Sequence, residues 1–342
     1  PLGIEPSEFA FQAATILLSL GRPDEAKQAI SDITTSKDNP RHMCILADIT
    51  HQMGDPREAV KICQLGVAKA QQSDQETARA ELMLQLGLSL RDLGDRSAAT
   101  QAIYDARDVL SQQGFRRRLA EANLAEAQLA LGRGHPRAAK VLIDPIIAVS
   151  QTLKMANIEA QAWSLKLNIA TAMGDTSSAN ETIQLRPEAL SVGLAGWRHA
   201  QARWHWAQRD LSKAIELVTW NQVDSATEVH MAIDAARLFL TQGDRNQASR
   251  AIDPALEFTQ SRGLRELHLL ASLVADTIIP GDAEARRALH YQARTSPWIE
   301  LSLGCLALDG RRWHALGDRK KSRTSYQSLL DRTRHLGDHF HQ

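Results

Sequence analysis

The chain has 342 residues, 43% of them hydrophobic, and its 40 basic and 40 acidic residues balance to a formal net charge of zero. This hydrophobic content is ordinary for a folded protein and excludes a mainly disordered chain. The balanced charge excludes a general electrostatic attraction to nucleic acids or acidic membranes. Because no apolar run approaches the about 18 residues that a membrane helix needs, no membrane span is predicted.

A short phrase recurs along the chain: a Gly, usually an Asp, and then an Ala that opens a helix. A fixed period of about forty residues predicts a stack of helical hairpins. No segment alternates between apolar and polar residues for long enough to predict a strand, so the predicted fold class is all-α. The clear copies of the phrase are at Gly21, Gly54, Gly94, Gly134, Gly174, Gly243 and Gly317, and weaker copies are at Arg209 and Gly281.

The third copy, residues 82–106, has the fullest pattern and explains the others. Gly87 allows two helices to cross closely, Gly94 ends the first helix in a left-handed turn, and Asp95 caps the second helix. Ala99 lies where the hairpin is narrowest. Other copies keep small residues at the crossing position (Ala14, Ala47, Ala236) and at the narrowest position (Ala26, Ala59, Ala179, Ala214, Ala248).

This pattern resembles the tetratricopeptide repeat, whose first-helix signature positions are occupied by Met83, Leu86, Gly87 and Leu90. The resemblance covers the chain at the level of repeat type. It implies a right-handed α-solenoid, a superhelix of about nine TPR-like helical hairpins. The long period and the linkers at 110–114 and 259–264 resemble the variant found in sensory arms of large bacterial regulators such as the maltose activator.

We predict one superhelical domain over residues 1–342, excised from a longer protein. The first helix begins almost at once, near Ser7, and the segment after His335 is too short to form a polar cap. A chain that ends naturally here is the alternative. The weaker copies at Arg209 and Gly281 predict less regular stacking, and we place a joint near residues 195–225.

The three cysteines, Cys44, Cys63 and Cys305, have neither a disulfide framework nor metal-ligand spacing. We therefore predict buried free thiols in a reducing compartment, the cytoplasm. This localisation is provisional, because the opening residues 1–3 resemble the remnant of a cleaved tag and a targeting segment can have been removed with it.

The motifs of catalysis are missing from the sequence. There is no phosphate-binding Gly loop, no HExxH, no GxSxG and no convincing acid–base pair, so we predict no enzyme activity, no cofactor and no metal site. The tail histidines His335, His339 and His341 are interpreted as a solvated terminus rather than a metal site. The arginines of 115–118 are interpreted as a helix start with solvated or acid-paired charges, and nucleic-acid binding is disfavoured.

The resemblance implies that the first helix of each hairpin lines a concave groove. Groove-facing positions are mostly apolar or neutral in the N-terminal half and basic or aromatic past the middle. Arg side chains bind carboxylates in a forked geometry and Trp offers an anchor surface, so an acidic or carboxylate-bearing peptide is the expected ligand. The candidate binding residues are Asn168, His199, Arg203, Trp206, His230, Arg237 and Arg311.

A structural interpretation of the same residues stands beside this one. Trp163, Trp197 and Trp220 are expected to pack between helices, and surface Arg and His side chains are often only solvated. The predicted function is a non-enzymatic protein–protein interaction module, which binds a protein segment or effector in its groove and acts as the regulatory arm of a larger protein. The alternative is a static scaffold for assembly. The sequence indicates no particular oligomeric state.

Overall fold

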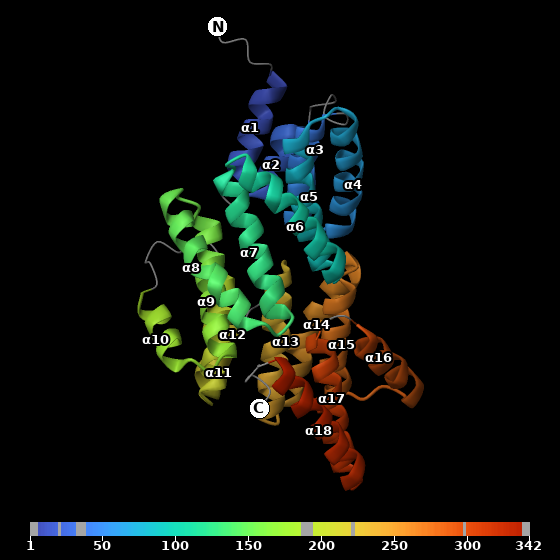
Figure 1. The fold of residues 1–342 in the computed structure, drawn as a ribbon. Coiled ribbons are helices and arrows are strands. Elements are labelled where there is room, and N and C mark those ends of the chain that lie inside the picture. Colours follow the sequence, from blue (N-terminus) through green and yellow to red (C-terminus); the bar gives the residue numbers. More distant parts are fainter. Residues whose placement is uncertain are drawn as a thin grey trace. The chain divides into compact units, whose positions relative to one another are not determined.

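The computed structural model describes residues 6–19, 22–31, 39–185, 194–219, 223–296 and 299–336. Within these ranges the chain forms eighteen helices (Figure 1). They are α1 (Pro6–Ser19), α2 (Pro23–Ile30), α3 (Pro40–Gln52), α4 (Pro56–Gln72), α5 (Glu76–Asp92), α6 (Arg96–Gln112), α7 (Arg116–Gly132), α8 (Pro136–Thr152), α9 (Ala156–Ala172), α10 (Thr176–Gln184), α11 (Leu194–Ala207), α12 (Leu211–Val218), α13 (Ala226–Thr241), α14 (Arg245–Arg262), α15 (Arg265–Ile278), α16 (Ala283–Thr295), α17 (Ile299–Ala315) and α18 (Arg319–Leu336).

Consecutive helices pack as hairpins, which confirms the predicted all-α fold of TPR-like repeats. The chain divides into two compact units. Unit 1 comprises Pro1–Glu126 and Pro145–Glu159, and unit 2 comprises Ala127–Asp144 and Ala160–Gln342. The single superhelical domain and the joint near 195–225 stay predictions, and residues 220–222 of that segment lie outside the described residues.

The turns between helices recur at a constant interval in this part of the chain. From α4 to α9 every helix has 17 residues. A residue with positive φ follows each helix from α3 to α9, at intervals of twenty positions, because the φ angle of that residue turns the chain back on itself. These residues are Gly54, Asp74, Gly94, Gly114, Gly134, Lys154 and Gly174.

The turn between α5 and α6 shows how one segment closes a helix and opens the next. Gly94 N donates to Arg91 O at 3.0 Å, and Asp95 N donates to Leu90 O at 3.0 Å, which together make a Schellman motif. The Asp95 carboxylate accepts a hydrogen bond from Ala98 N at 3.0 Å and so caps α6. The roles predicted for Gly94 and Asp95 are confirmed.

The copy that lacks a Gly keeps the same turn. Arg209 adopts a φ of 64°, in the left-handed region that usually favours Gly, and the Asp210 carboxylate accepts from Lys213 N at 3.1 Å. The turn therefore forms without Gly, and the less regular stacking expected here stays a prediction. Arg209 N donates to Trp206 O and Asp210 N donates to His205 O, both at 2.9 Å, and these hydrogen bonds hold Arg209 in this conformation at a cost of about 1 kcal/mol.

Small residues set the spacing of the helices. A Cβ added to Gly87 would lie 2.5 Å from Ile103 Cγ1 and 3.1 Å from Ala99 O, so α5 and α6 cross as closely as predicted. We define the narrow position as the fourth residue of the second helix of each hairpin. It is a fully buried alanine in Ala26, Ala59, Ala99, Ala139, Ala179, Ala214 and Ala248.

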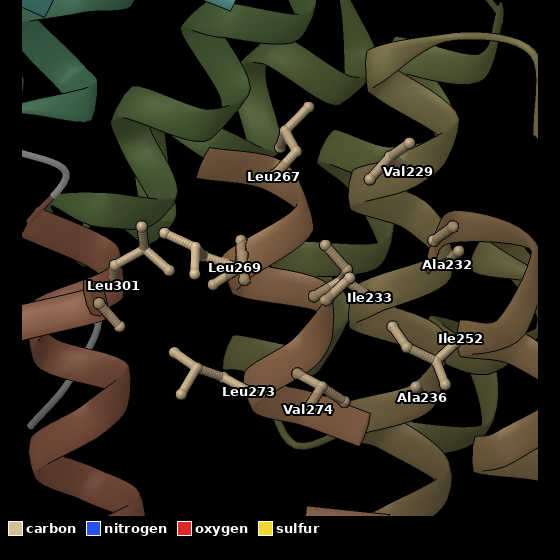
Figure 2. Packing of buried hydrophobic residues seen from close by; sticks show 14 of the residues in the cluster. Val229, Ala232, Ile233, Ala236, Ile252, Leu267, Leu269, Leu273, Val274 and Leu301 are labelled. Atoms are coloured by element: carbon tan, nitrogen blue, oxygen red, sulfur yellow. The ribbon is translucent and has the colours of Figure 1, made fainter. Parts of the chain in front are cut away.

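Close spacing allows larger side chains to meet beyond the narrow position. In unit 2, Val229 and Ile233 of α13 lie against Ile252 of α14 and Val274 of α15 in one apolar cluster (Figure 2). Each of these side chains is at most 5% exposed. Burial of this kind contributes about 1.5–3 kcal/mol per side chain and holds the neighbouring hairpins together.

The α15–α16 hairpin departs from this pattern. Its narrow position is Arg286, whose Nε lies 2.9 Å from Asp276 Oδ2 and whose Nη2 donates to Gly281 O at 2.7 Å. One turn later His290 stands where five other second helices have Ile. Of the thirteen residues of α16, only Ala293 is fully buried. We call the surface along which α16 contacts its neighbouring helices its seam. This seam is therefore ionic rather than apolar.

The crossing at Gly87 predicts a specific loss of stability. Gly87→Ala places a methyl group against both the side chain of Ile103 and the backbone, and we expect unfolding to become easier by about 1–3 kcal/mol. Gly66→Ala is the matched control, because its Cβ would meet only the flexible ends of Leu82 at 2.8 and 2.9 Å. Urea titration followed by circular dichroism measures both. Equal losses in the two variants would contradict the argument.

The ionic seam of α16 predicts weak protection of its backbone. Few buried apolar contacts lower the free energy of local opening. We expect the amides of α16 to exchange with deuterium faster than those of α14, which buries Ala248, Ile252, Ala255 and Thr259. Hydrogen exchange followed by mass spectrometry makes the comparison within one unit. Protection of α16 as strong as that of α14 would refute this account.

Candidate functional site

Four of the predicted binding residues meet around a residue that we did not predict. His199 and Arg203 on α11, and His230 and Arg237 on α13, surround Asp234. His199 Nε2 lies 2.9 Å from Asp234 Oδ2, and Arg237 Nη1 donates to Asp234 Oδ1 at 3.2 Å. Arg203 Nε lies 3.8 Å from Asp234 Oδ2. These five residues are called the Asp234 cluster.

Helical spacing explains the convergence. His199 and Arg203 are four residues apart on α11, and Asp234 and Arg237 are three apart on α13, so each pair shares a helix face. The two helices come from consecutive hairpins and pack against each other. The imidazole rings of His199 and His230 face one another with centroids 6.2 Å apart and 22° between their planes.

Asp234 is ionised despite its burial. Its side chain is only 9% exposed, and burial by itself raises the pKa of a carboxyl group. The hydrogen bond with His199 and the charges of Arg203 and Arg237 outweigh burial and hold the pKa of Asp234 well below its usual range. The carboxylate is therefore an anion at neutral pH, and it accepts a hydrogen bond from Arg237 and lies within ion-pair distance of Arg203.

The cluster as a whole is positive and open to solvent. One carboxylate faces two guanidinium groups and two histidines. The side chains of Arg203 and Arg237 are 29% and 27% exposed, whereas the anion between them is buried. Because the outward side of the cluster is cationic and pre-positioned, it is suited to bind a carboxylate or another anion.

The remaining predicted residues lie elsewhere in unit 2. Trp206 of α11 is half-buried and packs against the apolar cluster that joins α11, α12 and α13. Asn168 is half-buried on α9 and Arg311 is exposed on α17. Within the described part of the chain, no hydrogen bond or ion pair connects Asn168 or Arg311 to the Asp234 cluster.

We predicted that the other tryptophans pack between helices, and this is confirmed for those that the structure describes. Trp163 and Trp197 are buried, with 6% and 1% of their surface exposed. Trp204, which the sequence placed beside His205, is also buried at 6%. Trp220 lies outside the described residues.

The arginine run at 115–118 opens α7, and its last member is paired with acids as expected. Arg118 Nη1 lies 2.7 Å from Glu121 Oε2, and Arg118 Nε lies 3.7 Å from Glu81 Oε1. The charge of Glu121 raises the pKa of Arg118 above its already high value. This arginine is part of an internal ion-pair network in unit 1.

The three cysteines are buried and free, as predicted. Burial raises the pKa of Cys63 and of Cys305 to about 12, and that of Cys44 further still, so these thiols stay protonated. Among the described residues no three His, Cys, Asp or Glu side chains are grouped to hold a metal ion. His339 and His341 lie outside this part. None of the described helices is both long enough and apolar enough to cross a membrane.

The sequence around Asp234 indicates its role, although we did not predict it. It stands four residues after His230 and three before Arg237, so it shares their predicted face, and it is the single acid within a long apolar stretch of α13. Acids with the same role recur. Asp92 Oδ2 lies 2.8 Å from His51 Nε2, and Asp309 Oδ1 lies 3.2 Å from His290 Nδ1.

The burial of Asp234 predicts a large effect of removing it. Asp234→Ala leaves Arg203, Arg237 and His199 facing one another without an anion, and we expect a loss of about 2–4 kcal/mol in the free energy of unfolding. Asp144→Ala is the control in the same unit, since its ion pair with Lys166 is on the surface. That loss is expected to be about 1 kcal/mol or less. Chemical denaturation at neutral pH measures both.

The depressed pKa of Asp234 also fixes the direction of a pH effect. A carboxyl group whose pKa is lower in the folded state stabilises the protein above its unfolded pKa of about 4, and this contribution is lost as the pH falls further. The difference in stability between the native protein and Asp234→Asn should therefore shrink below about pH 4. A difference that stays constant down to pH 2.5 would exclude the proposed charge pairing.

The fold is similar to two solved structures. The apo form of the quorum sensor NprR from B. thuringiensis is 9% identical with a TM-score of 0.57, over 95% of this chain and 97% of that chain. A Rap protein complexed with competence and sporulation factor is 12% identical with a TM-score of 0.50, over 97% of this chain and 98% of that chain. No protein-family model and no curated protein matches. Both neighbours are tetratricopeptide-repeat proteins, and the chain shares their fold: it is a TPR-like helical-repeat protein.

Proposed function

We propose that the chain is a non-enzymatic protein-interaction module with a regulatory role. In this proposal the face of α11 and α13 that carries the Asp234 cluster binds an acidic or carboxylate-bearing protein segment or effector. The role of a sensory or regulatory arm and a cytoplasmic location belong to the same proposal. The buried free thiols support a reducing compartment.

The observation that carries the proposal is the charge arrangement of the Asp234 cluster. A buried anion is costly unless it is paired, and replacing such a network with apolar residues often leaves stability unchanged or raises it. Compared with an apolar replacement of the whole network, the paired Asp234 cluster therefore offers little net stability, although removing the carboxylate alone is costly. What the arrangement does supply is two guanidinium groups held in place, with their ordering entropy already lost before a ligand arrives.

The two structural neighbours support the regulatory part. One is described as a quorum sensor, and the other was solved in complex with a competence and sporulation factor. Helical-repeat chains of this overall construction therefore serve as signalling proteins. A static scaffold is the alternative, and it requires no anion-selective face.

An array of peptides that each carry either a free or an amidated C-terminus, with acidic and neutral sequences, tests the proposal. We expect the protein to bind acidic or free-carboxylate peptides and Arg203→Gln plus Arg237→Gln to lose at least about tenfold in affinity. Gln is chosen because Glu at either position would add a carboxylate beside Asp234 and unfold the cluster.

The matched control is Arg245→Gln plus Arg250→Gln, which removes two exposed arginines from α14 without touching the cluster. Binding that survives in the control and is lost in the test variant supports the proposal. Binding that both variants retain places the interface on another face, and peptides bound without regard to charge overturn the carboxylate preference. Circular dichroism confirms that each variant is folded.

A further inference from the structure

A second concave feature lies away from the Asp234 cluster. Residues of α14, α15 and α16 enclose an open cavity of about 290 Å³ in unit 2. Its apolar wall includes Ile252, Ile278 and Leu289, and its polar side chains are those of Ser249, Asp253, Asp276 and Arg286. The volume is near the lower end of the roughly 300–1,000 Å³ typical of small-molecule sites, so a ligand of amino-acid size fits.

The cavity has a definite cause in the sequence. Arg286 occupies the narrow position, where seven other hairpins have a fully buried alanine. A long side chain at this position prevents α16 from packing closely against α15. Instead Arg286 extends along the hairpin to Asp276, and space remains between α16 and the neighbouring α14.

Arg286 is held in a fixed orientation at one side of the cavity. Its Nε lies 2.9 Å from Asp276 Oδ2, and its Nη2 donates to Gly281 O at 2.7 Å. A guanidinium carries five N–H donors in a rigid plane, so these two bonds engage one edge and leave donors on the other. Asp276 and Gly281 thus orient an edge that can receive a carboxylate.

The opposite charge is supplied by Asp253 on α14. This carboxylate is exposed, lines the cavity, and forms no hydrogen bond or ion pair with the described residues. The Ser249 hydroxyl, one turn earlier on the same helix, offers a further acceptor and donor. The cavity therefore combines an oriented cation, an accessible anion and an apolar wall.

We propose that this cavity binds a free apolar α-amino acid of about the size of leucine. The carboxylate of the ligand meets the outer edge of Arg286, its ammonium group meets Asp253, and its side chain contacts Ile252, Ile278 and Leu289. The site is independent of the peptide-binding face proposed above. A small molecule bound here contacts α16, the helix whose seam is ionic.

Titration of the 342-residue protein with three matched probes tests the proposal. L-Leucine carries both charges, isocaproate lacks the ammonium group, and isoamylamine lacks the carboxylate. Binding is followed by the methyl resonances of Ile252, Ile278 and Leu289. We expect L-leucine to bind at least about tenfold more tightly than either analogue, because each lost charge removes a charge-assisted hydrogen bond.

Two variants and one control locate the binding. Asp253→Asn should weaken L-leucine to the level of isocaproate and leave isocaproate unchanged. Glu257→Gln removes an exposed carboxylate one turn further along α14, outside the cavity wall, and should change nothing. Ala285→Phe fills the cavity from the exposed side of α16 and should abolish binding of all three probes.

Other results of the same titrations would contradict the proposed amino-acid site. L-Leucine that binds no better than its analogues, or whose binding survives Ala285→Phe, overturns the proposal. An Asp253→Asn variant that still binds L-leucine more tightly than isocaproate would also reject it. The peptide-array result for Arg203 and Arg237 is independent of each of these measurements.

Discussion

The distance between the two helices of a hairpin depends on one small side chain. Ala99 and its equivalents have no exposed surface, and Gly87 leaves no space for even a methyl group. At such spacing, the side chain one turn further along, Ile103 in one hairpin and Ile252 in another, is buried between the helices of its own hairpin. The turn motifs bring the helices together, but the small residue decides whether the seam closes. The α15–α16 hairpin demonstrates this dependence, since Arg286 at the same position produces an ionic seam and a cavity.

A second constraint follows for charged groups on the first helices. Close packing leaves no room for water around a buried carboxylate, so each must find its cations among neighbouring side chains. Asp92, Asp234 and Asp309 all do so, each with a histidine partner. Of the three, the Asp234 cluster gathers two arginines whose side chains are about a quarter exposed. This combination of an interior anion and partly exposed arginines is the reason that we propose the Asp234 cluster, rather than the other two, as a binding face.

Much of this architecture was predictable because it is local. Gly94, Asp95 and Ala99 act within a few residues of one another, and their roles follow from backbone geometry alone. His199 and Arg203 were likewise placed on one face by helical spacing. Local spacing places Asp234 on the face of His230 and Arg237, but its pairing with His199 joins residues 35 positions apart, and the local pattern does not encode that partner. The left-handed conformation of Arg209 runs against intrinsic preference, and the hydrogen bonds of the turn override that preference.

Turns within a hairpin and turns between hairpins have different residues at the position that begins the next helix. Turns inside a hairpin use Asp95 or Asp244, whose carboxylates cap the second helix. The turn between hairpins α13–α14 and α15–α16 has Leu264 instead, with no side-chain cap and 3% exposure. A cap contributes about 1 kcal/mol, whereas burying a leucine contributes about 1.5–3 kcal/mol, so the apolar residue is favoured where hairpins stack. Hairpin closure and hairpin stacking therefore rest on different residues. The Asp234 cluster depends on stacking, since α11 and α13 belong to consecutive hairpins, and the cavity beside α16 depends on incomplete closure, so a change in one need not alter the other.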